Sequence, residues 1–184
     1  MSRNKGFTLV ELLVVISIIA MLLGILFPAL AGARQSARKV TCKSNLHGCA
    51  VAFRMYLDEN NNTMPSAVYL PTIPTDKEKE QNLQPISKIM AKYLSGSEAL
   101  KCPGDKGGEY FTEQGSSYEY DIILNGIRLD KKEITIERFG HSITVPLAEI
   151  YVMRDYDAFH GKEDEKGSVM YFYADNLISD VERN

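Results

Sequence analysis

The sequence lacks the local motifs that usually mark enzymes and metal-binding proteins. Its three cysteines, Cys42, Cys49 and Cys102, form no CxxC pair, so a structural zinc site is not expected. No GxSxG, HExxH or P-loop segment occurs, and the C-terminal part holds only His141 and His160 as histidines. Since no catalytic constellation is visible, the chain is not expected to be an enzyme.

Basic residues are scarce where a nucleic-acid surface would need them. The chain has 184 residues, of which 24% are charged, and its formal net charge is −3. No basic patch with interleaved aromatic side chains appears after residue 60, so nucleic-acid binding is not expected. The length leaves room for a membrane helix and one small domain.

Charge is also nearly absent from residues 7–30, whose one charged side chain is Glu11. A helix of about 24 residues rises about 36 Å and can cross a hydrocarbon core about 30 Å thick. Ala29-Leu30-Ala31 resembles a secretory cleavage site, but such signals have a shorter apolar region of about 7–15 residues. A charge inside a bilayer costs about 2.5–3.5 kcal/mol or more, so we expect Glu11 to be functional.

Residues 5–16 read Lys-Gly-Phe-Thr-Leu-Val-Glu-Leu-Leu-Val-Val-Ile. This segment resembles the class III signal of type IV pilins and type II secretion pseudopilins. The resemblance implies that a prepilin peptidase cuts between Gly6 and Phe7 and methylates the new amino group of Phe7. It also implies that Glu11, the fifth residue after the cut, is the family's assembly glutamate. The expected partners are then this peptidase, copies of the chain or other pilin-like subunits, and the inner membrane.

The physical chemistry of a buried carboxylate agrees with this interpretation. A carboxylate removed from water needs a cationic partner. In a filament of identical helices, that partner is predicted to be the amino group of Phe7 in a neighbouring subunit, which exists only after cleavage behind Gly6. The resemblance further implies a single-pass protein of the bacterial inner membrane, with a cytoplasmic N-terminus and an exported C-terminal domain, that enters a filament after assembly.

Helical signals continue to about Glu59, so four segments are predicted. Residues 1–6 are a leader peptide, residues 7–30 a transmembrane and assembly helix, residues 31–59 the exported half of that helix, and residues 60–184 a globular domain. Two apolar stripes follow nearly opposite sides of the exported half. We expect the second stripe to pack against the globular domain and the first to face neighbouring subunits or lipid. The first stripe is Leu30, Ala33, Ala37 and Val40; the second is Cys42, Leu46, Cys49, Phe53 and Leu57.

The globular domain is predicted to hold a small sheet. Residues 64–85 are a long surface loop with an extended piece, and residues 86–93 a short amphipathic helix. Strands are predicted at residues 117–124, 134–139, 147–153, 168–173 and 177–181, with a hairpin turn at residues 174–176. A parallel sheet would need more crossover helices than the sequence offers. The fold class is therefore α+β: a long N-terminal helix packed against a small, mainly antiparallel, pilin-like sheet domain.

A second resemblance concerns this domain. Cys102-Pro103-Gly104-Asp105, Ser117-Tyr118-Glu119-Tyr120 and His160 are similar to segments of pilin-like proteins from planctomycete–verrucomicrobial bacteria. Those proteins have a Cys-Pro-x-Asp turn, a Ser-Tyr-x-Tyr segment and a late histidine, followed by a strand and an Asp-Gly turn. Here Asn176 replaces the glycine of that turn, and asparagine also tolerates left-handed backbone geometry.

Two further features of the globular domain bear on its cofactors. We predict a disulfide between Cys102 and a helix cysteine, with Cys42 as the first choice and Cys49 as the second, and with buried free thiols as the equal alternative. His160, near Asp155 and Asp157, is interpreted as a solvated loop histidine rather than a base or metal ligand. No cofactor is predicted apart from a possible calcium ion.

The calcium candidates are Asp155, Asp157 and Asp164 in an acidic loop. Calcium prefers several oxygen ligands, and major pseudopilins, by resemblance, often bind calcium in a late loop. Lys162 and Lys166 dilute the negative charge of this loop.

Two functions remain open. The chain is either a structural subunit of a type IV pilus-like or type II secretion pseudopilus filament, or a membrane-anchored exported binding domain that uses the helix only as an anchor. Because Glu11 is predicted to have no use in a simple anchor, the sequence favours the filament subunit. It does not separate pilus from pseudopilus, or a major from a minor subunit.

Overall fold

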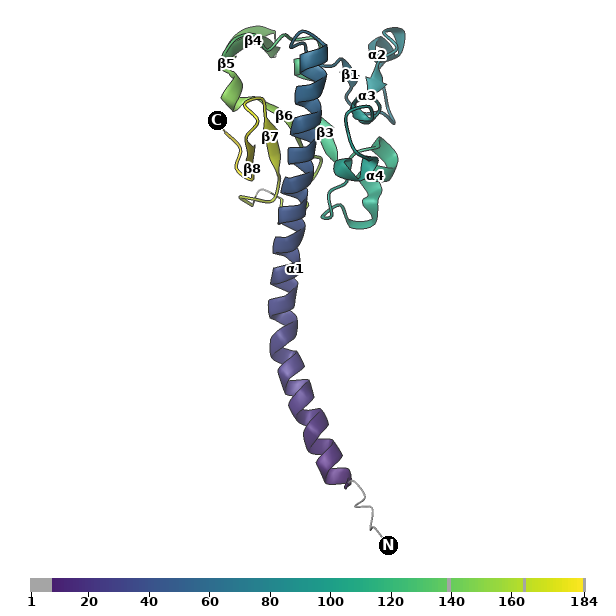
Figure 1. Cartoon of the computed structure of the whole chain (residues 1–184), viewed down its shortest axis with the longest axis vertical. Helices are drawn as coiled ribbons and strands as arrows, with labels where there is room; N and C mark the ends of the chain where they lie inside the picture. The colour runs from purple at the N-terminus through teal and green to yellow at the C-terminus, as the bar shows by residue number, and fades with distance from the viewer. Residues whose placement is uncertain (1–7, 139, 164, 184) are drawn as a thin grey trace. The chain divides into compact units, whose positions relative to one another are not determined.

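The structure is a computed structural model that describes residues 8–138, 140–163 and 165–183. The chain divides into two compact units, Met1–Ala37 and Arg38–Asn184. Helix α1, Leu9–Glu59, is the longest element and contributes residues to both units (Figure 1). The predicted helix end at Glu59 is confirmed, and Asn61 and Asn62 follow it with left-handed φ angles of 52° and 54°.

Residues 9–37, which we call the exposed part of α1, bury no side chain. Every residue from Thr8 to Arg38 is exposed, and the most apolar 18-residue window of α1 has a mean hydropathy of 2.9. The helix continues through Pro28. By length and composition, α1 is able to cross a membrane.

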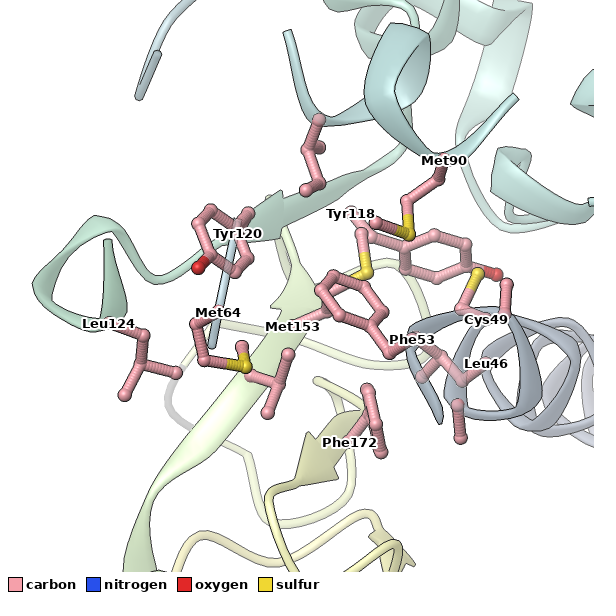
Figure 2. Close-up of a cluster of buried hydrophobic side chains, with 14 of the residues drawn as sticks. Leu46, Cys49, Phe53, Met64, Met90, Tyr118, Tyr120, Leu124, Met153 and Phe172 are labelled. Atoms are coloured by element: carbon pink, nitrogen blue, oxygen red, sulfur yellow. The ribbon is translucent and has the colours of Figure 1, made fainter. Parts of the chain in front are cut away.

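Residues 38–59, the packed part of α1, bury one face. The side chain of Phe53 stacks on Tyr120 with ring centroids 5.8 Å apart and meets Phe172 at 5.9 Å. Figure 2 shows how Phe53 and Leu46 enter a core shared with the sheet. The second predicted stripe is thereby confirmed, because all five of its members are buried. The buried residues of α1 are Cys42, Leu46, Cys49, Ala50, Ala52, Phe53 and Leu57.

The main sheet has four antiparallel strands in the order β3-β6-β7-β8. The strands are β3 (Tyr118–Tyr120), β6 (Tyr151–Asp155), β7 (Tyr171–Tyr173) and β8 (Ile178–Ser179). Asn176 takes a left-handed φ of 66° in the turn between β7 and β8, as predicted for the residue in the glycine position. The predicted α+β class, a long helix with a small antiparallel sheet, is confirmed.

The described residues also form two smaller sheets of two strands each. β4 (Glu133–Arg138) and β5 (His141–Pro146) form an antiparallel hairpin, and β1 (Ala67–Val68) pairs in parallel with β2 (Gln84–Pro85). Strand β5 was not predicted. The predicted strands 117–124 and 147–153 are shorter in the structure, because residues at one end of each form 3-10 helices, η3 (Ile122–Leu124) and η4 (Leu147–Glu149).

The short helices differ most from expectation. The predicted helix 86–93 is α3, which ends earlier (Ile86–Met90), and α4 (Glu109–Gln114) was not predicted. Helix α2 (Asp76–Glu80) lies inside the predicted loop. It forms because Thr75 and Glu78 make a capping box, in which each side chain accepts a hydrogen bond from the other residue's backbone N–H. The remaining 3-10 helices are η1 (Ser97–Leu100) and η2 (Lys106–Gly108).

Candidate functional site

The start of α1 holds the first candidate site. The carboxylate of Glu11 accepts hydrogen bonds from the backbone N–H of Thr8 at 2.8 Å and from its hydroxyl at 2.6 Å. In return, the Thr8 hydroxyl accepts from the backbone N–H of Glu11 at 3.2 Å. Thr8-Leu9-Val10-Glu11 is therefore a capping box, which satisfies backbone donors that the first helical turn would otherwise leave unpaired.

The contact between Thr8 and Glu11 corrects one expectation about the role of Glu11. Glu11 was predicted to have no use in a simple anchor, but its bonds to Thr8 cap the helix within a single chain. The Ser/Thr-x-x-Glu spacing could have revealed the cap from sequence. Gly6 and Phe7 lie outside the described residues, so the cleavage site and the pairing of Glu11 with a Phe7 amino group stay predictions.

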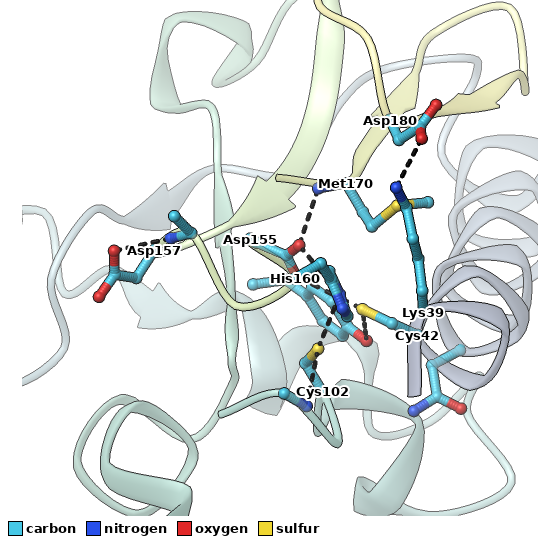
Figure 3. Close-up of polar contacts among 12 residues, drawn as sticks. Lys39, Cys42, Cys102, Asp155, Asp157, His160, Met170 and Asp180 are labelled. Carbon is cyan, nitrogen blue, oxygen red and sulfur yellow. Dashed lines mark hydrogen bonds and ion pairs between the residues drawn. The ribbon is translucent and has the colours of Figure 1, made fainter. Parts of the chain in front are cut away.

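The second candidate site is a buried cluster of four side chains, which we call the Cys–Asp–His cluster. One potential ligand atom from each residue lies within 4.8 Å of all the others, and all four residues are buried. Figure 3 shows His160 between Cys102 and Asp155, with Cys42 reaching in from α1. The members are Cys42 from α1, Cys102 from the turn after η1, Asp155 at the end of β6 and His160 in the following loop.

The contacts inside the cluster are short. The Sγ atom of Cys102 lies 3.3 Å from Nε2 of His160, and the same nitrogen lies 3.5 Å from Oδ2 of Asp155. The Cys42 thiol contacts Oδ1 of Asp155 at 3.4 Å. The four groups therefore form one connected polar centre, in which the exposed fractions of the His160 and Asp155 side chains are 1% and 0%.

Two backbone N–H groups and a tyrosine hydroxyl contact the cluster from outside. The N–H of Met170 donates to Oδ2 of Asp155 at 2.7 Å, and the N–H of Gly104 donates to the sulfur of Cys102 at 3.4 Å. The hydroxyl of Tyr118 lies 3.2 Å from the Cys42 sulfur. These contacts fix the direction in which each sulfur and carboxylate oxygen points.

The Cys-Pro-Gly-Asp segment folds as the predicted turn, and its sequence explains the position of Cys102. The N–H of Asp105 donates to the carbonyl of Cys102 at 3.0 Å, which closes the turn. The Asp105 carboxylate accepts from the hydroxyl of Ser117 at 2.8 Å and anchors the turn beside β3. A Cβ atom on Gly104 would lie 2.7 Å from Cβ of Phe159, so only glycine lets the loop carrying His160 approach this closely.

Burial and mutual charge shift the protonation of the cluster. The hydrogen bond from Cys42 lowers the pKa of Cys102, with help from His160 and the N–H of Gly104, and the same bond and burial raise the pKa of Cys42. Burial, together with the charge of Cys102, raises the pKa of Asp155 to about 8. Of the two thiols of the cluster, Cys102 is therefore the one whose pKa is lowered.

The predicted disulfide is not formed in the structure, although its first-choice partners meet. Cys42 and Cys102 belong to one cluster, and all three cysteines are free thiols. The thiol of Cys49 instead donates to the carbonyl of Ala99 at 3.6 Å. Neither pairing is tested by these contacts, so the disulfide stays a prediction.

The interpretation of His160 as a solvated loop residue is wrong, because its imidazole is buried against Cys102 and Asp155. The calcium candidates also separate. Asp155 is buried in the Cys–Asp–His cluster, whereas Asp157 is exposed and accepts from the N–H of Ala158 at 2.7 Å. Asp164 lies outside the described residues, and calcium binding stays a prediction. His141 is exposed in β5.

Comparison with known proteins points to the N-terminal segment. Residues 1–27 match the family model of the prokaryotic N-terminal methylation motif. The chain is 42% identical over 62 residues to the type IV wide pilus major component PilA4 of Thermus thermophilus, an overlap of 34% of this chain and 47% of that protein. The chain thus spans about half the length of that relative.

A second relative is covered almost completely. The chain is 30% identical over 140 residues to the type II secretion system core protein G of Escherichia coli, an overlap of 71% of this chain and 97% of that protein. No solved structure matches.

Proposed function

The chain belongs to the family of type IV pilin-like proteins and type II secretion pseudopilins, and we propose that it is a structural subunit of a pilus-like or pseudopilus filament. The observation that carries this proposal is the exposed part of α1, an apolar helix with Glu11 at its start. An apolar helix exposed on all sides needs lipid or neighbouring helices around it. A filament subunit meets both environments: its helix is surrounded by lipid before assembly and by neighbouring helices afterwards.

The proposed route begins at the leader. A prepilin peptidase cuts between Gly6 and Phe7 and methylates the amino group of Phe7, while the chain spans the inner membrane once with its C-terminal domain exported. In the filament, the carboxylate of Glu11 pairs with the Phe7 amino group of a neighbouring copy or of another pilin-like subunit. The bonds from Thr8 hold this carboxylate beside the helix start, and carboxylate oxygens have further acceptor capacity for the incoming amine.

The second compact unit, Arg38–Asn184, which we call the globular unit, is proposed to serve as the exported part of the subunit. Its core is filled by the packed part of α1 and the sheet, which supports a role in presenting a surface on a filament. We propose that it performs no catalysis and binds no nucleic acid. The relatives are a type IV pilus component and a type II secretion core protein, so the membrane-anchored binding domain is not favoured, although the capping role of Glu11 would also suit a simple anchor.

Intact mass of the membrane-extracted protein tests the processing step. We expect a mass that lacks residues 1–6 and carries one added methyl group. A full-length mass, or a cut after Ala31, would contradict the proposal. Protease protection in sealed, inside-out inner-membrane vesicles tests the orientation, because an exported C-terminal domain lies inside them and is protected until the vesicles are opened.

A pair of variants separates the two roles of Glu11. Glu11→Gln keeps a side chain able to complete a capping box but removes the charge, whereas Thr8→Val removes the capping hydroxyl and keeps the charge. We expect Glu11→Gln to insert normally and to lose filament assembly, and Thr8→Val to assemble. Filaments are counted by electron microscopy of sheared material. Normal assembly of Glu11→Gln would leave only the helix cap as a role for Glu11 and would contradict its pairing with the Phe7 amino group. Absence of filaments from the unsubstituted protein would favour the anchor.

A further inference from the structure

The Cys–Asp–His cluster brings together four metal-binding side chains from three separate stretches of the chain. We propose that this cluster binds one zinc ion, which joins α1 to the loops at one end of the sheet. The site lies wholly within the globular unit, so it does not depend on the filament function proposed above.

The spacing of the four side chains fits the metal. Zinc bonds of about 2.3 Å to sulfur and about 2.0–2.2 Å to nitrogen or oxygen place the corners of a tetrahedral site about 3.3–3.8 Å apart. The sulfur of Cys102 lies 3.3 Å from Nε2 of His160, and the sulfur of Cys42 lies 3.4 Å from Oδ1 of Asp155. One ligand atom from each of the four residues lies within 4.8 Å of all the others. Pairs of ligand atoms that stand wider than a tetrahedral edge must therefore close by at most about 1 Å to surround the ion.

The donor set selects zinc over the predicted calcium. Two thiols and an imidazole are soft or borderline ligands, which zinc accepts in four-coordinate sites. Calcium takes six to eight oxygen ligands, and the cluster offers only the carboxylate of Asp155. All four residues are buried, which is typical of a closed structural site rather than of a catalytic site with an open position.

The surrounding donors orient the ligands. The N–H of Met170 occupies Oδ2 of Asp155, so Oδ1 is the oxygen turned toward Cys42. The N–H of Gly104 and the hydroxyl of Tyr118 contact the two sulfur atoms. Such outer contacts commonly hold metal ligands in place.

Charge gives a further reason for a cation. Two thiols, a carboxyl group and an imidazole out of contact with water are costly unless a positive charge or strong hydrogen bonds compensate them. Zinc binds both sulfurs as thiolates, Asp155 as a carboxylate and His160 as a neutral imidazole. The protons carried by these groups in the metal-free protein are released to solvent on binding.

A disulfide between Cys42 and Cys102 is the competing use of the same residues. This bond would use only the two sulfur atoms and would give no metal-binding role to His160 and Asp155. The zinc site uses all four side chains, which is why we favour it over the bond that the sequence suggested.

The first measurement is the metal content of the full-length protein, purified in detergent without chelator. We expect about one zinc ion per chain, and replacement by cobalt(II) should produce the visible absorption bands of a tetrahedral thiolate site. Zinc at background level after reduction and reloading would overturn the proposal. So would a Cys42–Cys102 disulfide in the extracted protein, found as a mass two hydrogens lower, or calcium in place of zinc.

The matched variants are Cys102→Ser and Cys49→Ser. Both remove a buried thiol, but only Cys102 belongs to the cluster. We expect Cys102→Ser to lose zinc and the cobalt bands, and Cys49→Ser to keep both. Equal zinc loss in the two variants would overturn the assignment.

Tyr118→Phe provides a milder test in case Cys102→Ser fails to fold. It removes one hydroxyl contact to Cys42 and should weaken zinc affinity about tenfold, the lower end for outer contacts of metal ligands. Affinity is measured by competition with a chromophoric chelator. Unchanged affinity would argue against Cys42 as a ligand.

Discussion

The two parts of α1 belong to one helix but differ in what surrounds their apolar side chains. In the exposed part, residues 9–37, apolar side chains such as Ile18 and Phe27 remain 55% and 63% exposed. In the packed part, residues 38–59, Phe53 is 2% exposed and Leu46 is fully buried. The difference shows that the packed part obtains its environment from its own chain, whereas the exposed part must obtain it from lipid or from other subunits.

Phe53→Ala should have the largest effect in this comparison. Removing a buried aromatic side chain costs about 3–5 kcal/mol of unfolding free energy, because Phe53 contacts both Tyr120 and Phe172. Phe27→Ala, with its side chain 63% exposed, should change the stability of the globular unit by less than about 0.5 kcal/mol. Denaturant titration of the detergent-solubilised protein, followed by tyrosine circular dichroism, measures both. Equal losses would show that the two parts are not separate in stability.

Ile18→Arg tests membrane insertion, a property that should depend on the exposed part of α1 and not on the packed part. Arginine near the centre of a membrane helix costs about 2.5–3.5 kcal/mol or more, so the inserted fraction should fall. Val51→Arg is the control, because Val51 is exposed to a similar degree, 51% against 55% for Ile18, but lies in the packed part. Membrane fractionation of the two variants measures insertion. If Ile18→Arg inserts as fully as Val51→Arg, the exposed part is not a membrane segment.

Gly48→Ala should produce the smallest change and the opposite sign. A Cβ atom at Gly48 meets nothing within 4 Å, so alanine should stabilise the helix, and with it the globular unit, by about 0.5–1 kcal/mol. Gly24→Ala, equally unobstructed in the exposed part, should leave the unfolding of the globular unit unchanged. The same denaturant titration checks both. Destabilisation by Gly48→Ala would contradict the open space that surrounds this position.

Local patterns predicted the parts of the fold that local physics controls. The stripe from Cys42 to Leu57 follows helical spacing and is buried as expected, and Asn176 forms the predicted turn. Strand β5 and helix α4 escaped prediction. For β5 the reason is physical: His141 and Ile143 are exposed, and the strand is held by its backbone pairing with β4 rather than by an apolar pattern.

The sequence by itself determined the membrane-length helix and the capping box at its start. Both features can be predicted from residues that are close together in the chain. Membrane insertion depends on the composition of one apolar run, and helix capping depends on a spacing of three positions. The tertiary structure alone decided the Cys–Asp–His cluster. Its members come from three separate stretches of chain, because Asp155 and His160 are only five residues apart whereas Cys42 and Cys102 are distant from them and from each other. No short spacing joins the cysteines to this pair, and only folding turns His160 from an expected surface residue into a buried neighbour of Cys102.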